Sequence, residues 1–189
     1  MAEDTLKRVE LTDDEYTVKQ KLVRNRYQVF DTDNELVLEA AQKLFKMKED
    51  FRFKNADGEP AFRVQAEKRL DFSGDYTITD EETGDVVAVL NKNFTFFRHR
   101  WNIKTPEGEE VAVVRSRSLL LDVLRAFSDI LSFLPHKYSI ETVDGEEIGE
   151  IEGKFAIRDQ YTIRIEDARG LPRESLIAAA ITVDALEGN

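Results

Sequence analysis

Aromatic and aliphatic residues alternate with polar residues in a unit that recurs along most of the chain. In each unit an aromatic residue is followed two positions later by another apolar residue, with a polar residue between them. The six pairs are Tyr27/Val29, Phe51/Phe53, Tyr76/Ile78, Trp101/Ile103, Tyr138/Ile140 and Tyr161/Ile163. Residues i and i+2 share one face of a strand, so the pattern predicts strands with one buried and one solvated face.

A turn signal follows each of these strands. The signals lie at 31–34, 55–58, 82–84, 105–108, 144–145 and 167–170. They are rich in Asp, Asn and Gly, residues that readily adopt the positive φ values of tight hairpins. A returning apolar strand follows each of the first five signals, and residues 16–22 supply one strand before the first pair. The pattern therefore predicts twelve short strands in an antiparallel meander.

The segment 175–186, near the end of the chain, is apolar on nearly every side when drawn as a helix. Such a helix is buried in protein or in lipid, and a bilayer-spanning helix needs roughly 20 residues. A barrel of twelve strands leaves an interior too wide for strand side chains alone to fill. We therefore predict a closed twelve-stranded antiparallel barrel with this helix in its interior.

A second helix is expected at about 118–134, inserted between two hairpins and ended by Pro135. Starting at Ser118, polar residues at spacings of 4, 3, 4 and 3 form one narrow stripe, and nearly all the other residues are apolar. This wide apolar face leaves three interpretations open: a plug or cover on the barrel, a protein or homodimer contact, and an interfacial membrane helix. The contact residues expected in the last two cases are Leu120, Leu124, Phe127 and Leu131.

These predictions define the domain organisation. Residues 15–189 form a single barrel domain, and the fold class is mainly β with two helices. Residues 1–14 are acidic and show no hydrophobic period, so they are predicted to be a mobile N-terminal tail.

The chain resembles the LURP-one-related family over residues 15–189. The resemblance lies in residues 16–22, the repeated aromatic-x-aliphatic strands with Asp/Gly turns, and the small-residue helix that ends in Val183-Asp184-Ala185-Leu186. It places the chain in the superfamily of phospholipid scramblases and tubby C-terminal domains, and so implies a tubby C-terminal-like barrel of twelve strands around a C-terminal helix. It implies little about activity, because members of this superfamily differ in role.

Composition narrows the function classes. The net charge is −11, with a pI near 4.8, no cysteine and two histidines. This charge argues against nucleic-acid binding, and the lack of cysteine excludes disulfides, thiolate nucleophiles and Cys-based zinc sites. No signal peptide, P-loop or nucleophile elbow is present. We therefore expect a cytoplasmic protein without cofactor or metal, either haloarchaeal or an ordinary acidic protein of another prokaryote.

Basic residues gather at the junctions between hairpins, opposite the acidic hairpin tips. We call this expected feature the basic rim. Its candidate ligand-binding residues are Lys19, Lys21, Arg24, Arg26, Lys43, Lys46, Arg98 and Arg100. The rim would attract anionic phospholipid at a membrane periphery. Alternatively, its cations pair with neighbouring carboxylates.

The function expected from these features is a non-enzymatic binding or scaffold domain of the LURP-one-related type. It would contact anionic lipid or a protein partner through the basic rim. The alternatives are a scramblase-like lipid-handling protein and, with no motif to support it, an enzyme.

Overall fold

The computed structural model describes residues 6–21, 26–41, 50–66, 75–95, 98–117, 137–153, 160–171 and 173–187. Twelve strands and one helix, α3 (Arg173–Glu187), lie within these residues. The strands are β1 (Glu15–Lys21), β2 (Arg26–Phe30), β3 (Leu36–Ala41), β4 (Asp50–Lys54), β5 (Pro60–Ala66), β6 (Asp75–Asp80), β7 (Val86–Thr95), β8 (Arg98–Lys104), β9 (Glu110–Ser116), β10 (Lys137–Thr142), β11 (Glu147–Gly153) and β12 (Gln160–Ile165).

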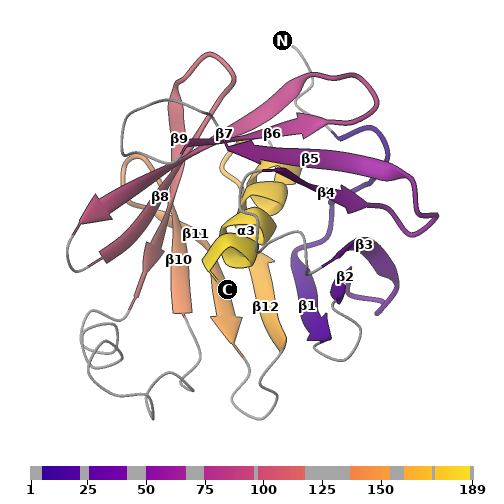
Figure 1. Cartoon of the computed structure of the whole chain (residues 1–189). Coiled ribbons are helices and arrows are strands. Elements are labelled where there is room, and N and C mark those ends of the chain that lie inside the picture. The colour runs from indigo at the N-terminus through magenta and orange to yellow at the C-terminus, as the bar shows by residue number, and fades with distance from the viewer. Residues whose placement is uncertain are drawn as a thin grey trace.

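The strands form a closed antiparallel barrel in chain order, in which β1 pairs with β2 on one side and with β12 on the other. Figure 1 shows this ring of strands with α3 inside it. The predicted twelve-stranded barrel around a C-terminal helix is therefore confirmed. The second predicted helix, at 118–134, lies outside the described residues.

The hairpin turns gather at one end of the barrel, which we call the hairpin end. The opposite ends of the strands define the other, the junction end. Gly58 and Gly108 adopt φ values of 82° and 91°, in the left-handed region where a residue with a Cβ atom is strained. In each of these two turns the glycine N–H donates to the carbonyl three residues earlier, that of Asn55 and of Thr105 respectively. The Asp/Asn/Gly signals thus form tight hairpins as expected.

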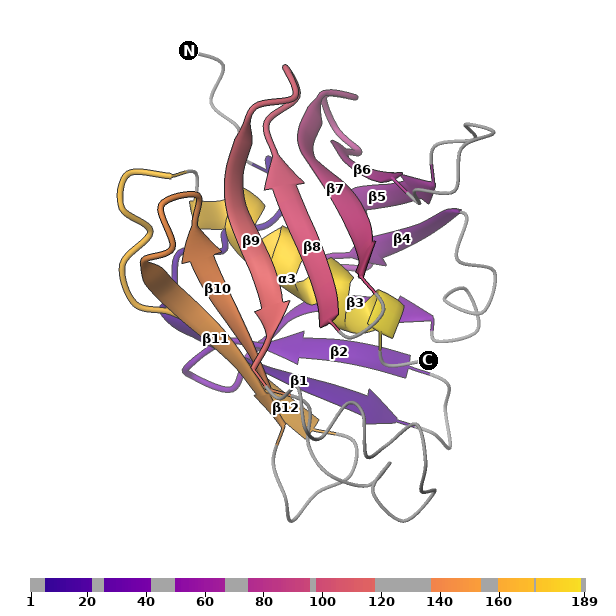
Figure 2. The same cartoon turned by 90° about the vertical axis from the view of Figure 1, so that its left-hand side faces the viewer.

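Helix α3 runs obliquely through the barrel from the hairpin end to the junction end (Figure 2). Its residues from Ser175 to Val183 are all buried. The run Ala178–Ala180 leaves room for the barrel wall to approach the helix closely. Thr182, a polar residue in this core, donates its hydroxyl to the carbonyl oxygen of Ala178 at 2.8 Å. The helix is therefore the centre of the hydrophobic core.

Aromatic side chains line the wall around α3, as the sequence pattern predicts. Phe53 stacks on Phe62 with a centroid distance of 4.5 Å and packs edge-on against Tyr27 at 5.8 Å. The hydroxyl of Tyr27 donates to the carbonyl oxygen of Ile181 in α3 at 3.2 Å, and Tyr161 donates in turn to the Tyr27 hydroxyl. Hydrogen bonds of this kind satisfy the polar ends of buried tyrosines.

Pairing between neighbouring strands is uneven around the barrel. Strands β7 and β8 share seven register pairs, from Val89/Lys104 to Thr95/Arg98. Strands β3 and β4 share the single described pair Glu39/Lys54, and they diverge from each other towards the junction end (Figure 2). We call this weakly paired contact the β3–β4 seam.

The N-terminal segment differs from the mobile tail predicted for residues 1–14. Leu6, Val9 and Leu11 are 4%, 8% and 0% exposed and belong to the core cluster. Residues 6–14, which we call the N-terminal strap, therefore pack against the barrel, and the prediction is wrong for them. The strap is held by partners distant in sequence, so a periodicity test could not detect it.

Among the described residues, no helix combines the length and the hydropathy that crossing a bilayer requires.

Candidate functional site

The N-terminal strap crosses the hairpin end of the barrel and contacts three of the hairpins and the start of α3. Polar groups of the barrel bind its main chain. The amide of Leu6 donates to Glu174 Oε2 at 3.1 Å, and the amide of Lys7 donates to Asp80 Oδ2 at 2.8 Å. The carbonyl oxygen of Arg8 accepts a hydrogen bond from Asn55 Nδ2 at 3.2 Å. The barrel therefore recognises the backbone of the strap as well as its apolar side chains.

Asp80, the last residue of β6, is a carboxylate only 1% exposed. Its Oδ1 atom accepts the amides of Glu82 at 2.8 Å and Thr83 at 2.7 Å, and its Oδ2 atom accepts the amide of Lys7. Burial acts to raise the pKa of Asp80, but these amide hydrogen bonds outweigh it, so the pKa lies below its usual value of 3.8. Asp80 is thus a buried anion stabilised by backbone donors.

Glu174, in the first turn of α3, is the second carboxylate that binds the strap. Burial raises its pKa above the usual 4.5, and the charge of Glu10 adds to the rise. Hydrogen bonds from the amides of Leu11 and Leu6, together with the charge of Lys7, act in the opposite direction and only partly compensate. Burial therefore disfavours the charged form of Glu174, in contrast to Asp80.

Charged side chains fix both halves of the strap to the hairpins. Arg8 forms an ion pair with Glu82 at 3.2 Å and donates to the carbonyl oxygen of Pro60 at 3.1 Å. Asp13 Oδ2 accepts hydrogen bonds from the amide of Thr32 at 3.0 Å and from its hydroxyl at 2.6 Å. These bonds to Thr32 lower the pKa of Asp13. Arg173, the first residue of α3, donates to the carbonyl oxygen of Asp13.

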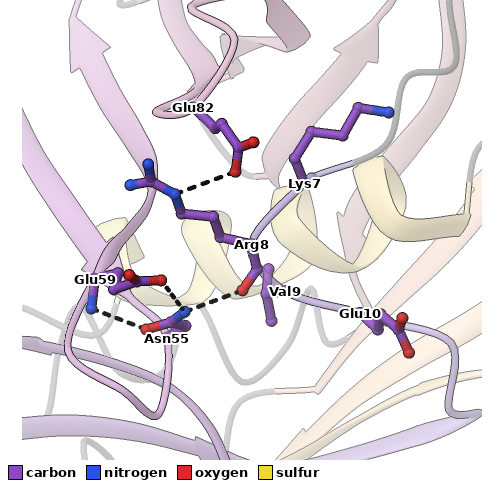
Figure 3. A pocket seen from close by; sticks show the side chains of 7 residues that line it. All are labelled: Lys7, Arg8, Val9, Glu10, Asn55, Glu59 and Glu82. Atoms are coloured by element: carbon purple, nitrogen blue, oxygen red, sulfur yellow. Dashed lines mark hydrogen bonds and ion pairs between the residues drawn. The ribbon is translucent and has the colours of Figure 1, made fainter.

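Two open grooves flank the strap. The first has a volume of about 580 Å³ and is lined by Lys7, Arg8, Val9, Glu10, Asn55, Glu59 and Glu82. Figure 3 shows Asn55 at its base, between the carbonyl of Arg8 and the side chain of Glu59, with the Arg8–Glu82 ion pair on the opposite wall. The second groove, of about 390 Å³, lies between the strap and the β2–β3 and β4–β5 hairpins, at the hairpin end of the β3–β4 seam. Arg8, Val9 and Glu10 of the strap line both grooves.

The structure describes only part of the predicted basic rim. The ammonium group of Lys19 lies 3.3 Å from Asn34 Oδ1 and 4.1 Å from the centroid of the Phe30 ring. Arg100 donates to Asn102 at 2.9 Å and pairs with Glu110 at 3.1 Å. Both side chains reach along the barrel wall towards the hairpin end, and the pairing of Arg100 matches the second interpretation of the rim.

For the remaining predicted residues, the structure gives the backbone position alone or does not describe the residue. Lys21 and Arg26 are register partners at the ends of β1 and β2, and Arg98 begins β8, so the backbone brings the first two together at the junction end. The positions that lie outside the described residues are Arg24, Lys43, Lys46, Leu120, Leu124, Phe127 and Leu131.

Groups that could bind a metal ion can be sought only within the described residues. Among the described residues, no group of three or more His, Asp or Glu side chains could hold a metal ion. The polar residues that the structure does bring together, Asn55, Asp80 and Glu174, come from two hairpins and a helix. The sequence signal for them is weak, because Asn and Asp are expected in hairpin turns for conformational reasons.

Comparison with known proteins shows which family the chain belongs to. A search of curated protein sequences finds no significant match. The X-ray structure of a protein from Arabidopsis thaliana has a similar fold, with a TM-score of 0.53 over 92% of this chain and 90% of that chain; the sequence identity is 7%, so the likeness concerns the fold alone. The LURP-one-related family model matches residues 36–184. The chain therefore belongs to the LURP-one-related family, as its barrel and central helix suggest.

Proposed function

We propose that this protein is a non-enzymatic binding domain in which the barrel is a rigid scaffold and the two ends make the contacts. The observation that carries the proposal is the position of α3. Barrels that hold a small molecule keep their interior open for it, whereas here the helix fills the interior and its residues from Ser175 to Val183 are buried. The LURP-one-related family is not known as an enzyme family, which agrees with this function.

The position of α3 also limits the lipid-handling alternative. A helix that is surrounded by its own barrel is not available as a membrane anchor. We therefore do not extend the proposal to scramblase-like activity.

The barrel wall is a poor candidate for the contact surface. Outward-facing cations on it are paired with carboxylates of neighbouring strands. Arg164 pairs with Glu15 at 2.6 Å and with Glu150 at 3.1 Å, and Arg115 pairs with Glu141 at 3.5 Å. Exposed pairs of this kind contribute little to stability, but they neutralise the charges that would attract an anionic partner.

For the junction end we propose contact with anionic phospholipid through the basic rim, supported by the sequence at Arg24, Lys43 and Lys46. Each cation near an anionic surface contributes about 1 kcal/mol. The apolar segment 118–134, which the sequence predicts to be a helix, remains a candidate protein contact.

A pair of double variants tests the rim. Lys43→Gln with Lys46→Gln removes two rim cations, and Arg115→Gln with Arg164→Gln removes two cations that are paired on the wall. Because the change in net charge is equal, only position distinguishes them. We expect the first variant to bind phosphatidylserine vesicles about thirtyfold more weakly than wild type, and the second to bind like wild type. Co-sedimentation with vesicles measures both.

Three outcomes would overturn the rim proposal. They are equal weakening in both variants, binding to pure phosphatidylcholine vesicles as strong as to phosphatidylserine vesicles, and no vesicle binding by wild type at low salt. Added salt should weaken true rim binding through screening.

A further inference from the structure

We propose that the hairpin end of the barrel is a binding groove for an extended peptide, and that the N-terminal strap occupies this groove as an intramolecular ligand. The inference rests on the proposed function as a binding domain, but it concerns the end of the barrel opposite to the basic rim. It assigns the groove a partner class: a peptide segment of another protein with the apolar spacing of the strap.

The groove binds main-chain atoms of the strap. The amides of Leu6 and Lys7 meet carboxylate oxygens, and the carbonyls of Arg8 and Asp13 meet the side chains of Asn55 and Arg173. Hydrogen bonds to the main chain are available to any extended peptide. They are the usual source of affinity where a protein binds peptide in extended form.

The binding groups of the groove are oriented by their own hairpins. Asp80 uses Oδ1 for the amides of Glu82 and Thr83 within its turn and keeps Oδ2 for the strap. The side chain of Asn55 likewise uses one atom within its hairpin and one for the strap. Its Oδ1 accepts a hydrogen bond from the amide of Glu59, and its Nδ2 donates to the strap. Both groups would hold their positions without the strap, so the site is preorganised.

The groove also distinguishes side chains. Leu6, Val9 and Leu11 are buried, whereas Lys7 and Glu10 between them and Thr12 after them are exposed. The groove therefore selects apolar residues at positions i, i+3 and i+5. Proline is excluded at i and i+1, because the amides of Leu6 and Lys7 are needed as donors.

The strap can leave without breaking the barrel. Residues 6–13 form no strand with the sheet, and the backbone–backbone hydrogen bond to a strand described for this segment is at its end, where Ile165 donates to the carbonyl of Asp14. The two grooves beside the strap, of about 580 and 390 Å³, are open to a second chain. A partner peptide could thus displace the strap stepwise from either side.

Displacement would have a consequence for the barrel itself. The strap binds Thr32 in the β2–β3 hairpin and Asn55 after β4, so it ties together the two sides of the β3–β4 seam, which share one described register pair. Binding of a partner's peptide would replace the strap as the link between these two hairpins. The groove thus couples partner binding to the strand pair with the fewest described register pairs.

The test uses the full chain with the strap displaced. Leu6→Asp with Val9→Asp puts two carboxylates into the apolar site, near the anionic partners of the strap, Asp80 and Glu174. This should expel the strap while leaving the binding groups of the barrel unchanged. The probe is a fluorescein-labelled peptide with the sequence of residues 3–14. A groove that is open about 1% of the time lowers apparent affinity about 100-fold. We therefore expect the variant to bind the peptide at least tenfold more tightly than wild type, by fluorescence anisotropy.

Two control peptides sharpen the result. In one, the residues matching Leu6, Val9 and Leu11 are replaced by Asp, which should abolish binding. In the other, the amide of Lys7 is N-methylated, which removes the donor to Asp80 Oδ2 and should weaken binding at least tenfold. Equal binding of all three peptides would contradict the proposal, as would no binding to a variant with a native circular dichroism spectrum.

Hydrogen exchange of the wild-type protein keeps the proposal falsifiable if the variant does not fold. We expect the amides of Leu6 and Lys7 to exchange by local opening, faster than core amides of β8 and β12. Exchange of these amides only at the rate of global unfolding would show that the strap is an inseparable part of the core. Either result leaves the vesicle experiment untouched, so failure here is distinct from failure of the rim proposal.

Discussion

Helix α3 and the N-terminal strap are two apolar segments that close the same barrel in different ways. The helix passes through the barrel and satisfies most of its main-chain hydrogen bonds internally. The strap passes across the hairpin end, has no secondary structure of its own, and depends on Asn55, Asp80 and Glu174 for its main-chain partners. The burial of the helix follows from its own apolar residues, whereas the burial of the strap depends on partners that are distant in the sequence.

This difference implies that α3 and the strap contribute unequally to the free energy of unfolding. Removing α3 would empty the core, while releasing the strap uncovers three apolar side chains and a few polar groups. We expect substitutions in α3 to be global in effect, and substitutions at the strap to be local and dependent on pH.

The largest effect is expected in the helix. Ala179→Glu places a charge in a fully buried position, and an unpaired buried charge costs more than about 3–5 kcal/mol. The protein should therefore fail to fold. The matched control is Val143→Glu, because Val143 is 55% exposed and the same charge should be harmless there. Circular dichroism and solubility decide the matter, and a soluble, cooperatively folding Ala179→Glu protein would contradict the assigned position of α3.

A smaller but sizeable effect is expected where the strap meets the β6–β7 hairpin. Asp80→Asn replaces an acceptor oxygen by an amide group that cannot accept, so we expect the free energy of unfolding to fall by about 2–3 kcal/mol at pH 7. Asp85→Asn, at an exposed site in the same hairpin, is the matched control. Urea unfolding measures both.

The pH dependence of stability tests the role of the Asp80 charge. Because the folded pKa of Asp80 lies below the usual 3.8, its contribution is present above that value and is lost as the pH falls through the folded pKa. Asp80→Asn should therefore flatten the acid limb of the stability curve. An unchanged acid limb would mean that other carboxylates govern acid unfolding.

The smallest effect is expected at Glu174. Its folded pKa is raised, so its contribution to stability is fully present below the usual 4.5 and is lost as the pH rises through the folded pKa. Glu174→Gln keeps an acceptor for the strap amides without the buried charge. We expect stability at pH 7 to stay the same or to rise by less than about 1 kcal/mol, with Glu166→Gln as the exposed control. A clear loss of stability would show that the strap needs the charge.

The sequence predicts the features that arise from local repetition. The period of two in the strands, with Asp/Gly turns between them, was sufficient to predict twelve strands, and the all-apolar segment 175–186 was sufficient to predict the central helix. In both cases neighbouring residues report on the same environment.

The strap could not be predicted in this way. Leu6, Val9 and Leu11 stand at spacings of 3 and 2 in an acidic segment, which matches neither a strand nor a helix. The orientation of Arg100 was also out of reach, because its partner Glu110 is on the neighbouring strand and the pairing depends on the register of β8 with β9. Burial and pairing that depend on a distant partner leave no periodic signal.

The uneven pairing of the barrel has a consequence for synthesis on the ribosome. Strands β1–β3 are held to the sheet chiefly through the five register pairs of β1 with β12, because β3 and β4 share one described pair. From Ala41 to Ile165, translation at about 5–20 residues per second takes about 6–25 s. During that time the first three strands pair with one another and weakly with β4, but the outer edge of β1 has no partner. An unpaired strand edge invites aggregation. The beginning of this chain must therefore remain soluble until almost all of the rest has been made.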